Sequence, residues 1–378
     1  MKISYVTNYD AMDIHNWSGL GYSIAKMLEN QHAEIDYVGN LELQTNIVLR
    51  LKQRIYKRLT GQCFELEREP FVAGSFARQI QLKLKTDTDI IFSPASTPIS
   101  LLKTNKPKVF YTDATFAGML GFYDAFSNLT KESIRHGNYL EQKALDSVAL
   151  AIYSSDWAAK SAMDDYHINP AKIKVVPFGA NVQNNLQYDD IKNIIQNRKK
   201  EVCNLLFIGV EWKRKGGDIA IKITERLNEL GIKTQLHMVG AKKIPIETLP
   251  GFVIDHGFVS KATEEGRNRI NDLLATSHFL LLPTRADCTP VVYSEANSFG
   301  LPCISTNVGG ISTIIRDNVN GKTFDLDTDV NEWCNFIIDY FTDAKKYNDL
   351  CLSSFSEYQN RLNWNVAGIE IMKLLKEI

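Results

Sequence analysis

The chain has 378 residues, of which 44% are hydrophobic and 23% charged, and its net charge is −1. Since one domain usually takes roughly 150 residues, this length predicts two domains of a soluble globular protein. The balanced charge excludes a global attraction to polyanions, so we expect no nucleic-acid partner.

The six cysteines are scattered without a CxxC pair, which argues against a zinc cluster or a disulfide framework. The amino-terminal segment turns polar at Asn8 and Tyr9, too early for the apolar region of a signal peptide. No apolar run reaches the length that a membrane-spanning helix needs. These features predict a cytoplasmic protein.

Short apolar runs bounded by turn residues recur in the first half, at 3–7, 90–93, 109–111 and 149–153. Amphipathic segments lie between some of them, and this alternation predicts a doubly wound parallel sheet. After Gly179 the chain becomes polar and unpatterned as far as Lys200. We expect the linker between two domains, residues 1–190 and 191–363, in this region.

The second half repeats the alternation. We expect strands at 205–208, 234–239, 278–282 and 302–306, a helix over 218–230 ended by Gly231, and a helix over 290–299 ended by Gly300. Because parallel crossovers are right-handed, the loop 209–217 should open at the carboxyl ends of the strands, where such sheets bind ligands.

One candidate site surrounds the start of the predicted helix 290–299. Thr289 is a preferred cap type and Pro290 suits the first helical position, so Asp287 falls in the loop and Glu295 more than a turn inside the helix. The positive end of a helix favours a phosphate group. The alternative is a capped surface helix that carries an incidental acid.

Two further segments follow strands at the same predicted edge. In loop 209–217, Lys213, Arg214 and Lys215 supply the positive charge, and the glycines the close backbone approach, that a diphosphate leaving group needs. Gly309 and Gly310 follow the strand 302–306 and allow a ligand against the backbone. A solvated basic turn and a plain tight turn are the alternatives.

In this order and spacing the three segments resemble the retaining glycosyltransferases of the GT-B fold, family four, also described as glycosyl transferases group 1. Phe207, Ile208 and the loop 209–217 are similar to the family's donor-diphosphate loop, and Asp287 with Glu295 is similar to its E-x7-E motif. The resemblance implies an α/β fold of two Rossmann-like domains with an interdomain cleft. It also implies that residues 1–190, joined by the helix 364–378, form the acceptor domain and residues 191–363 the donor domain.

The resemblance further implies transfer of a hexosyl unit from a UDP- or GDP-linked sugar to an acceptor hydroxyl with retention of configuration, in surface polysaccharide or glycoconjugate synthesis. The acceptor would be a sugar, a lipid-linked group or a protein. Arg214 or Lys213, with Lys215, would hold the diphosphate, Asp287 would contact the donor sugar and Glu295 the ribose. The expected catalytic residues are Asp113, Lys213, Arg214, Lys215 and Asp287. The expected donor-binding residues are Gly19, Gly209, Trp212, Gly216, Phe258, Val259, Thr289, Pro290, Val291, Val292, Glu295, Gly309 and Gly310.

Two departures from the family pattern leave alternatives open. Asp287 is one methylene shorter than the usual glutamate, and Asp113 lies where many members carry a histidine. Asp113 either orients an acceptor hydroxyl or the donor sugar, or caps the next turn. A nucleotide-sugar epimerase or phosphorylase of the same fold and a non-catalytic nucleotide-sugar-binding subunit therefore remain alternatives.

We expect no metal and no cofactor beyond the donor. The pairs Asp87/Asp89 and Asp325/Asp327 match the DxD pattern of metal-dependent enzymes, but the first precedes a predicted strand and the second lies in a late loop. The run 48–59 is amphipathic and basic, so it can lie on anionic lipid as a peripheral membrane contact or face a phosphorylated acceptor. A solvated basic face is the alternative.

Overall fold

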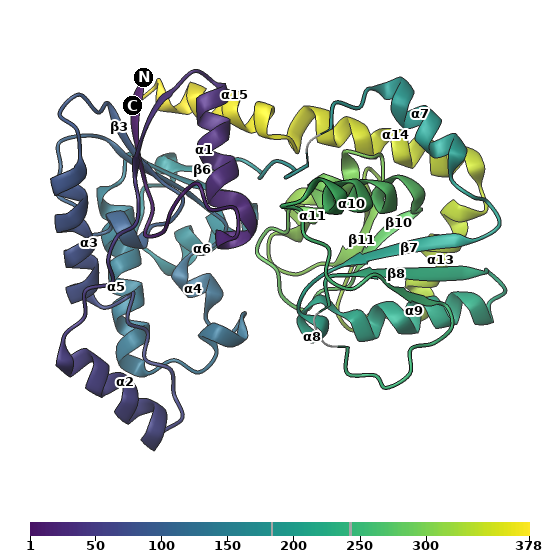
Figure 1. Ribbon diagram of the computed structural model, residues 1–378, viewed down its shortest axis with the longest axis horizontal. Helices are drawn as coiled ribbons and strands as arrows, with labels where there is room; N and C mark the ends of the chain where they lie inside the picture. The colour runs from purple at the N-terminus through teal and green to yellow at the C-terminus, as the bar shows by residue number, and fades with distance from the viewer. Residues whose placement is uncertain (183, 242–243) are drawn as a thin grey trace. The chain divides into compact units, whose positions relative to one another are not determined.

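The computed structural model describes residues 1–182, 184–241 and 244–378. The chain forms two compact units, one of Met1–Pro177 with Ala367–Ile378 and one of Phe178–Val366, so the chain returns to the amino-terminal unit at its end. Figure 1 traces this path in colour from purple to yellow. The assignment of the units as acceptor and donor domains stays a prediction.

The amino-terminal unit is built on a six-stranded parallel sheet in the order β2-β1-β3-β4-β5-β6. The register sets Tyr5 beside Tyr37 on one side and Phe92 on the other. The strand order reverses direction between β1 and β3, which is where such sheets bind ligands. The strands are β1 Lys2–Val6, β2 Glu34–Val38, β3 Ile90–Ser93, β4 Lys108–Thr112, β5 Leu150–Tyr153 and β6 Ile173–Val175.

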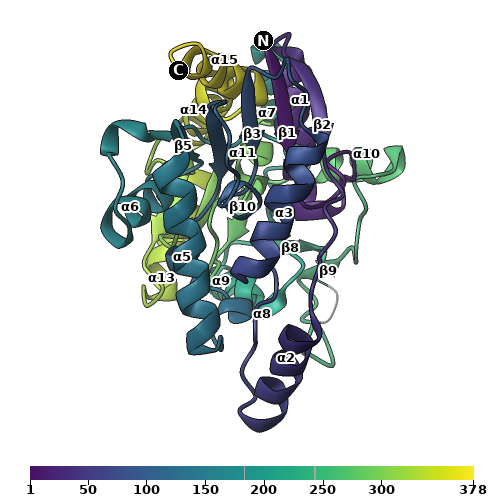
Figure 2. The ribbon, with the colours of Figure 1, turned by 90° about the vertical axis from the view of Figure 1, so that its left-hand side faces the viewer.

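Helices cover this sheet because their apolar stripes pack onto the buried strands (Figures 1 and 2). The helix α2 stands away from the sheet in both views. The helices are η1 Asn16–Gly19, α1 Leu20–Asn30, α2 Ile47–Leu59, α3 Pro70–Lys83, η2 Thr97–Ile99, α4 Phe116–Met119, η3 Asp124–Phe126, α5 Lys131–Ser147, α6 Asp156–Asp165, η4 Pro170–Lys172 and α15 Trp364–Leu375, the last shared with the other unit.

The carboxyl-terminal unit has a second six-stranded parallel sheet in the order β12-β11-β10-β7-β8-β9. Read from the other edge and renumbered from β7, this is the order 3-2-1-4-5-6 of dinucleotide-binding sheets. The two parallel sheets confirm the predicted α/β class with two Rossmann-like units. The strands are β7 Cys203–Ile208, β8 Thr234–Val239, β9 Val253–Asp255, β10 Phe279–Leu282, β11 Cys303–Thr306 and β12 Gly321–Phe324.

The helices of this unit close a core formed by both faces of the sheet. Gly231 ends α9 in the left-handed region, with Ile232 N–H donating to Leu227 O at 2.9 Å and Gly231 N–H to Asn228 O at 3.0 Å. The helices are α7 Tyr188–Asn197, α8 Trp212–Lys215, α9 Gly217–Glu229, α10 Glu264–Thr276, α11 Val292–Asn297, α12 Ile311–Ile314, α13 Val330–Phe341 and α14 Ala344–Arg361.

Two expected local structures are wrong. The polar segment after Gly179 contains α7, because Ile191 and Ile195 form a buried stripe and Gln187 makes a reciprocal capping box with Asp190. The helix expected from Pro290 begins at Val292 and has no side-chain cap. The preceding loop is instead tied to its neighbours, since Gly310 N–H donates to Cys288 O and Arg285 N–H to Arg214 O. These tertiary bonds override the local capping preference of Thr289.

Candidate functional site

The loops after β7 and β10 flank the position where the second sheet reverses its strand order. Arg285 N–H donates to Arg214 O at 2.7 Å, and the hydroxyl of Thr284 donates to the same oxygen at 3.0 Å. Two segments some seventy residues apart are thereby fixed side by side at the carboxyl edge of the sheet. This arrangement brings Arg214, Lys215 and Asp287 into one site.

Asp287 is the centre of an ion cluster. Lys215 Nζ donates to its two carboxylate oxygens at 2.9 and 2.8 Å, and Arg214 Nη1 donates to Oδ1 at 3.0 Å. Arg214 also donates to Ala286 O at 2.8 Å and to Glu211 Oε1 at 2.8 Å. This last bond holds the pKa of Glu211 below its usual range. Because Asp287 is buried, these bonds fix both cations in position.

Lys213 is not part of this cluster. Its side chain is 75% exposed and bonds to Asp218 Oδ2 at 3.0 Å. Arg285 binds both oxygens of Asp218 at 2.8 and 2.9 Å. Burial works to raise the pKa of Asp218, but the bonds from Arg285 and Lys213 outweigh it and lower the pKa to about 2. The structure therefore separates Lys213 from Arg214 and Lys215.

Close packing explains the glycines around the cluster. A Cβ on Gly216, whose φ is +78°, would lie 1.9 Å from Pro283 O, and one on Gly209 would lie 2.8 Å from the Lys215 side chain. Gly309 also has a positive φ, of 56°, and Gly310 joins the loop after β10 through its bond to Cys288. These glycines let three loops approach one another at the edge of the sheet.

The ring of Trp212 is buried in the core beside Phe207, with ring centroids 6.4 Å apart. A Cβ on Gly217 would lie 2.4 Å from that ring. A ligand at this edge would therefore meet the backbone of Trp212 and not its indole. The Trp212 ring orients the start of α9 beneath the basic loop 209–217.

Glu295 lies on α11 with its side chain fully buried. Lys261 Nζ, from the loop after β9, donates to Oε2 at 2.5 Å. Oε1 has no hydrogen-bond partner among the described residues. A buried acceptor without a partner costs about 1–3 kcal/mol, so a ligand that donates to Oε1 would recover that free energy.

The loop after β9 also contains Phe258 and Val259. Phe258 is 65% exposed, whereas Val259 is half-buried against the core. Gly240 N–H donates to Gly257 O at 2.8 Å, which joins this loop to the end of β8. An exposed ring beside Lys261 offers a flat apolar surface at the carboxyl edge.

The remaining predicted donor-binding positions lie where α11 begins. Thr289 is buried, Pro290 and Val291 are half-buried, and Val292 is the first residue of the helix. Glu295 N–H donates to Val291 O at 3.0 Å as the first bond of this turn. The donor-binding role expected of Val291 and Val292 stays a prediction.

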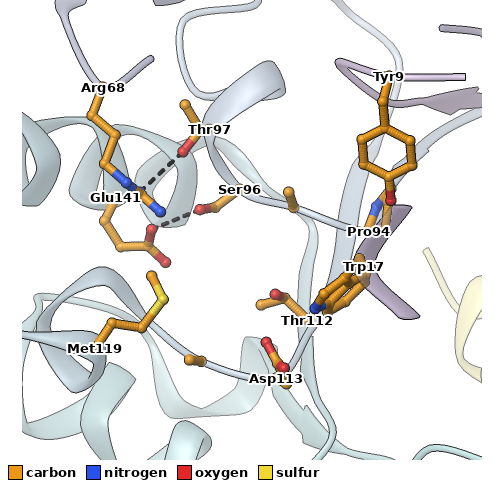
Figure 3. Close-up of a pocket in the computed structure, with 12 residues that line it drawn as sticks. Tyr9, Trp17, Arg68, Pro94, Ser96, Thr97, Thr112, Asp113, Met119 and Glu141 are labelled. Carbon is orange, nitrogen blue, oxygen red and sulfur yellow. Dashed lines mark hydrogen bonds between the residues drawn. The ribbon is translucent and has the colours of Figure 1, made fainter. Parts of the chain in front are cut away.

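The amino-terminal unit has a pocket of about 210 Å³ at the carboxyl ends of β1, β3 and β4 (Figure 3). Asp113, predicted as a catalytic residue, lines it. Thr115 Oγ1 accepts from Gly118 N–H at 3.0 Å and caps α4, and both roles considered for Asp113 stay predictions. The lining residues are Tyr9, Trp17, Arg68, Pro94, Ala95, Ser96, Thr97, Thr112, Asp113, Ala114, Met119 and Glu141.

Two buried polar atoms of this pocket have no hydrogen-bond partner among the described residues, namely the Tyr9 hydroxyl and Glu141 Oε1. Glu141 Oε2 accepts from Ser96 Oγ at 2.6 Å, and burial raises the pKa of this carboxyl. Burial also raises the pKa of Tyr9 to about 12. Arg68 donates to Thr97 Oγ1 at 3.1 Å and lies 4.6 Å above the Phe116 ring.

The first loop enters this pocket in a strained conformation. Trp17 and Ser18 have φ values of 45° and 54°, and Gly19, where α1 begins, has 79°. Positive φ is uncommon for residues other than glycine and costs free energy, and it often marks a functional site. The strained loop holds Trp17 against the pocket that Asp113 also lines.

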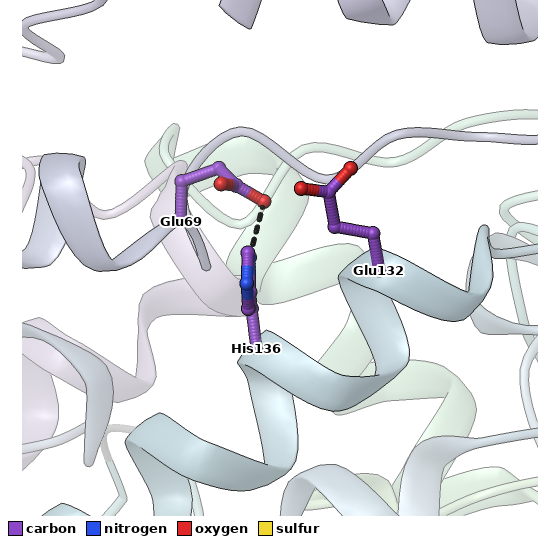
Figure 4. A group of neighbouring side chains, drawn as sticks. All are labelled: Glu69, Glu132 and His136. Atoms are coloured by element: carbon purple, nitrogen blue, oxygen red, sulfur yellow. Dashed lines mark hydrogen bonds and ion pairs between the residues drawn. The ribbon is translucent and has the colours of Figure 1, made fainter.

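A cluster of metal-ligating residue types lies elsewhere in the amino-terminal unit, with Glu69, Glu132 and His136 offering atoms within 4.8 Å of one another (Figure 4). His136 Nδ1 lies 2.9 Å from Glu69 Oε1. Lys52 Nζ lies 2.6 Å from Glu132 Oε1 and lowers the pKa of Glu132. The Lys52 ammonium therefore compensates part of the negative charge of this cluster. The carboxylates of the first DxD pair, Asp87 and Asp89, both accept hydrogen bonds from Lys2.

Several residues of these sites were not predicted. Lys261, Arg285 and Asp218 in one unit, and Arg68, Glu141 and Tyr9 in the other, carry no recognisable motif. Except for Tyr9, whose hydroxyl has no partner among the described residues, each bonds to a partner distant in the chain, as Arg285 does with Asp218 and Glu141 with Ser96. The only sequence signal of Tyr9, Lys261 and Arg285 is a polar side chain in the loop after a strand, which many surface residues share.

Comparisons with known proteins agree with this geometry. Residues 203–343 match the family model described as Glycosyl transferases group 1. The chain is 23% identical over 303 residues to the UDP-Gal:alpha-D-GlcNAc-diphosphoundecaprenol alpha-1,3-galactosyltransferase of Escherichia coli, covering 74% of this chain and 76% of that protein. Sucrose-phosphate synthase of Thermosynechococcus elongatus has a similar structure, with a TM-score of 0.69, 12% identity and coverage of 100% and 98%. HepE of Anabaena, solved with UDP and glucose, has a TM-score of 0.64 at 14% identity over 100% of both chains.

Proposed function

We propose that the chain transfers a hexosyl unit from a nucleoside diphosphate sugar to an acceptor hydroxyl, since residues 203–343 match the family model described as Glycosyl transferases group 1. The proposal includes retention of anomeric configuration and a role in surface polysaccharide or glycoconjugate synthesis. The observation that carries it is the Asp287 ion cluster at the strand-order reversal of the second sheet. The donor would bind at this edge.

Arg214 and Lys215 would act on the leaving group. When the bond between the sugar and the diphosphate breaks, negative charge grows on the diphosphate oxygens, and fixed cations stabilise it without reorganising. Asp287 supports this role because its bonds at 2.8–3.0 Å hold both cations in place before the donor arrives. Because a carboxylate has about four lone-pair sites, Asp287 could also accept from a hydroxyl of the donor sugar while it holds both cations.

Glu295 and Phe258 would bind the nucleoside. The unpartnered Oε1 of Glu295 is a buried acceptor suited to a ribose hydroxyl, and Lys261 keeps the charge of the carboxylate compensated. The exposed ring of Phe258 is suited to an apolar or aromatic face of the ligand. Gly309 and Gly310 would let the donor approach the backbone.

The acceptor would bind in the pocket of the amino-terminal unit. Sugars present hydroxyls around an apolar ring, and this pocket combines Trp17 with unpartnered atoms of Tyr9 and Glu141. Asp113 would orient the attacking hydroxyl. The acceptor is therefore expected to be a sugar, free or linked to a lipid or a protein.

The purified protein should be incubated with a panel of UDP- and GDP-sugars and candidate acceptors, and the products identified by NMR. Transfer with an unchanged anomeric configuration is the expected result. Isomerised donor without an acceptor would instead identify an epimerase. Tight donor binding without release of nucleoside diphosphate across the panel would identify a non-catalytic binding subunit, an alternative that the engaged state of Asp287 keeps open.

A further inference from the structure

The helix α2 is attached to its unit by one face only. On this inner face Leu49 is buried, Tyr56 stacks on Phe64 with ring centroids 5.6 Å apart, and Lys52 pairs with Glu132 at 2.6 Å. This pair joins α2 to the cluster in Figure 4. The inner face fixes the direction in which the rest of the helix points.

An apolar stripe on α2 is exposed. At 3.6 residues per turn its members fall within an arc of about 120°, outside the inner face. A single exposed apolar residue is ordinary, but a contiguous stripe on one helix marks an interaction surface. The stripe consists of Ile47, Val48, Leu51, Ile55 and Leu59, whose exposed fractions are 85%, 61%, 54%, 45% and 76%.

A basic stripe overlaps one edge of the apolar one, because Arg58 falls between Ile47 and Leu51 around the helix. Arg50, Arg54, Lys57 and Arg58 are exposed, and α2 contains no acidic residue. Within the described parts of the chain, no salt bridge involves any of these four cations. Their charge is therefore uncompensated and complementary to an anionic surface.

We propose that α2 binds the surface of an anionic lipid bilayer, with the apolar stripe inserted among the acyl chains and the basic stripe on the headgroups. A soluble polyanion such as nucleic acid would engage the cations but leave the apolar stripe in water, whereas a bilayer satisfies both stripes at once. The 13 residues of α2 are too few to span a bilayer. No helix in the described part of the chain is long and apolar enough to cross a membrane.

The proposal is independent of the donor site and predicts binding without any nucleotide sugar. Flotation with vesicles of phosphatidylcholine, alone or mixed with phosphatidylglycerol, measures it directly. We expect the protein to float with the mixed vesicles and to remain largely unbound with phosphatidylcholine alone. Binding should weaken as salt is added, because the headgroup attraction is screened.

Two variants, each with several substitutions, distinguish the contributions of the basic stripe and the apolar stripe to membrane binding. Changing Arg50, Arg54, Lys57 and Arg58 to Gln should lower the affinity for mixed vesicles by about fivefold per charge. Leu51→Ser with Ile55→Ser and Leu59→Ser should lower it by at least about tenfold, even at low salt. Leu82→Ser is the matched control, since Leu82 is an isolated apolar residue on α3 that is 88% exposed, and it should bind as the parent does.

All the changed side chains are exposed, so the variants should keep the parent's circular dichroism and Tm, and each is checked for both. The proposal is overturned if the parent does not float with mixed vesicles. It is also overturned if the triple Ser variant floats as well as the parent, or if heparin binds the parent and that variant equally while vesicles bind neither. These last results would instead assign α2 to a soluble polyanion.

Discussion

At the scale of single residues, Asp287 joins the two cations of the donor edge. It accepts three hydrogen bonds from Arg214 and Lys215 and is buried, so its carboxylate determines where these positive charges lie. Misplacing a reacting or stabilising group by about 1 Å can cost about 100-fold in rate. The function of Asp287 in this account is to keep both cations in position.

Asp287→Asn tests this function. The variant retains the shape but removes the negative charge, so we expect kcat to fall by about 100-fold while the affinity for nucleoside diphosphate stays the same or rises. Turnover kinetics together with titration calorimetry measure the two effects. A loss of nucleotide affinity with unchanged kcat would mean that Asp287 contacts the donor itself.

In the proposed function, Glu295 recognises the ribose of the donor nucleoside. Glu295→Gln should weaken binding of the cognate nucleoside diphosphate by about tenfold, since a hydrogen bond to a charged group contributes about 1.5–3 kcal/mol. The parent should bind this nucleoside diphosphate more tightly than its 2′- or 3′-deoxy form. The variant should bind the nucleoside diphosphate and its deoxy forms with nearly equal affinity. If the variant kept the full preference of the parent, Oε1 would not be the ribose acceptor.

Glu141 has the corresponding role in the pocket where we propose that the acceptor binds. Glu141→Gln keeps the volume of the side chain but alters the buried Oε1 that has no partner, so we expect a higher acceptor KM with an unchanged donor KM. Initial rates with each substrate varied in turn distinguish the two constants. A change in the donor KM alone would remove this pocket from acceptor binding.

At the scale of elements, one buried arginine holds the ends of two helices. Arg198 follows α7. Its guanidinium donates to Ala275 O in the last turn of α10 at 3.1 Å. It also donates to Phe299 O and Gly300 O, just after α11, at 3.0 and 3.2 Å. Its positive charge faces the negative ends of these helices. The residue thereby supports α11, the helix that carries Glu295.

Arg198→Met should therefore destabilise the protein. The change keeps an apolar stem but leaves the two buried carbonyls of Phe299 and Gly300 without this donor, at about 1–3 kcal/mol each, and removes a part-buried bond to Ala275 O. We expect the midpoint of chemical unfolding to fall markedly, as followed by circular dichroism. Arg226→Met on the exposed side of α9 is the control and should leave the midpoint nearly unchanged; an equally small effect of both would refute the role of Arg198.

Some secondary-structure elements could be predicted from the sequence and others could not. Strands such as β7 and β10 were predictable because a buried parallel strand is a short continuous apolar run. The start of α11 was not, because the preceding loop is held by tertiary bonds, from Gly310 N–H to Cys288 O and from Arg285 N–H to Arg214 O. The basic loop 209–217 was predictable from its composition. Its separation into Lys213 on one side and Arg214 with Lys215 on the other depends on Asp218 and Asp287, which no local pattern identifies as partners.

At the scale of the whole molecule, stability should depend on pH through His278. This buried ring accepts from Asn204 N–H at 2.9 Å, and burial, aided by Arg198, lowers its pKa to about 4. Between about pH 6.5 and pH 4 the unfolded chain binds a proton that the folded chain does not, so stability is complete above this range and falls as pH falls through it. The loss from this group reaches about 3 kcal/mol.

Urea unfolding at about pH 7 and about pH 4.5 measures this dependence, and His278→Gln is the test variant. We expect the variant to be less stable at neutral pH but to lose less stability on acidification than the parent does. His237, whose pKa burial also lowers to about 4, should account for part of the remaining slope. An identical slope in parent and variant would contradict the assignment.

The rate of nucleoside diphosphate release from the preferred nucleotide sugar, with acceptor present, tests the central claim most directly. The account predicts release by the parent, a loss of about 100- to 1,000-fold in Lys215→Ala, and parental rates in Lys222→Ala, an exposed position on α9. Equal rates in the parent and Lys215→Ala, or no release by the parent with any donor, would contradict it.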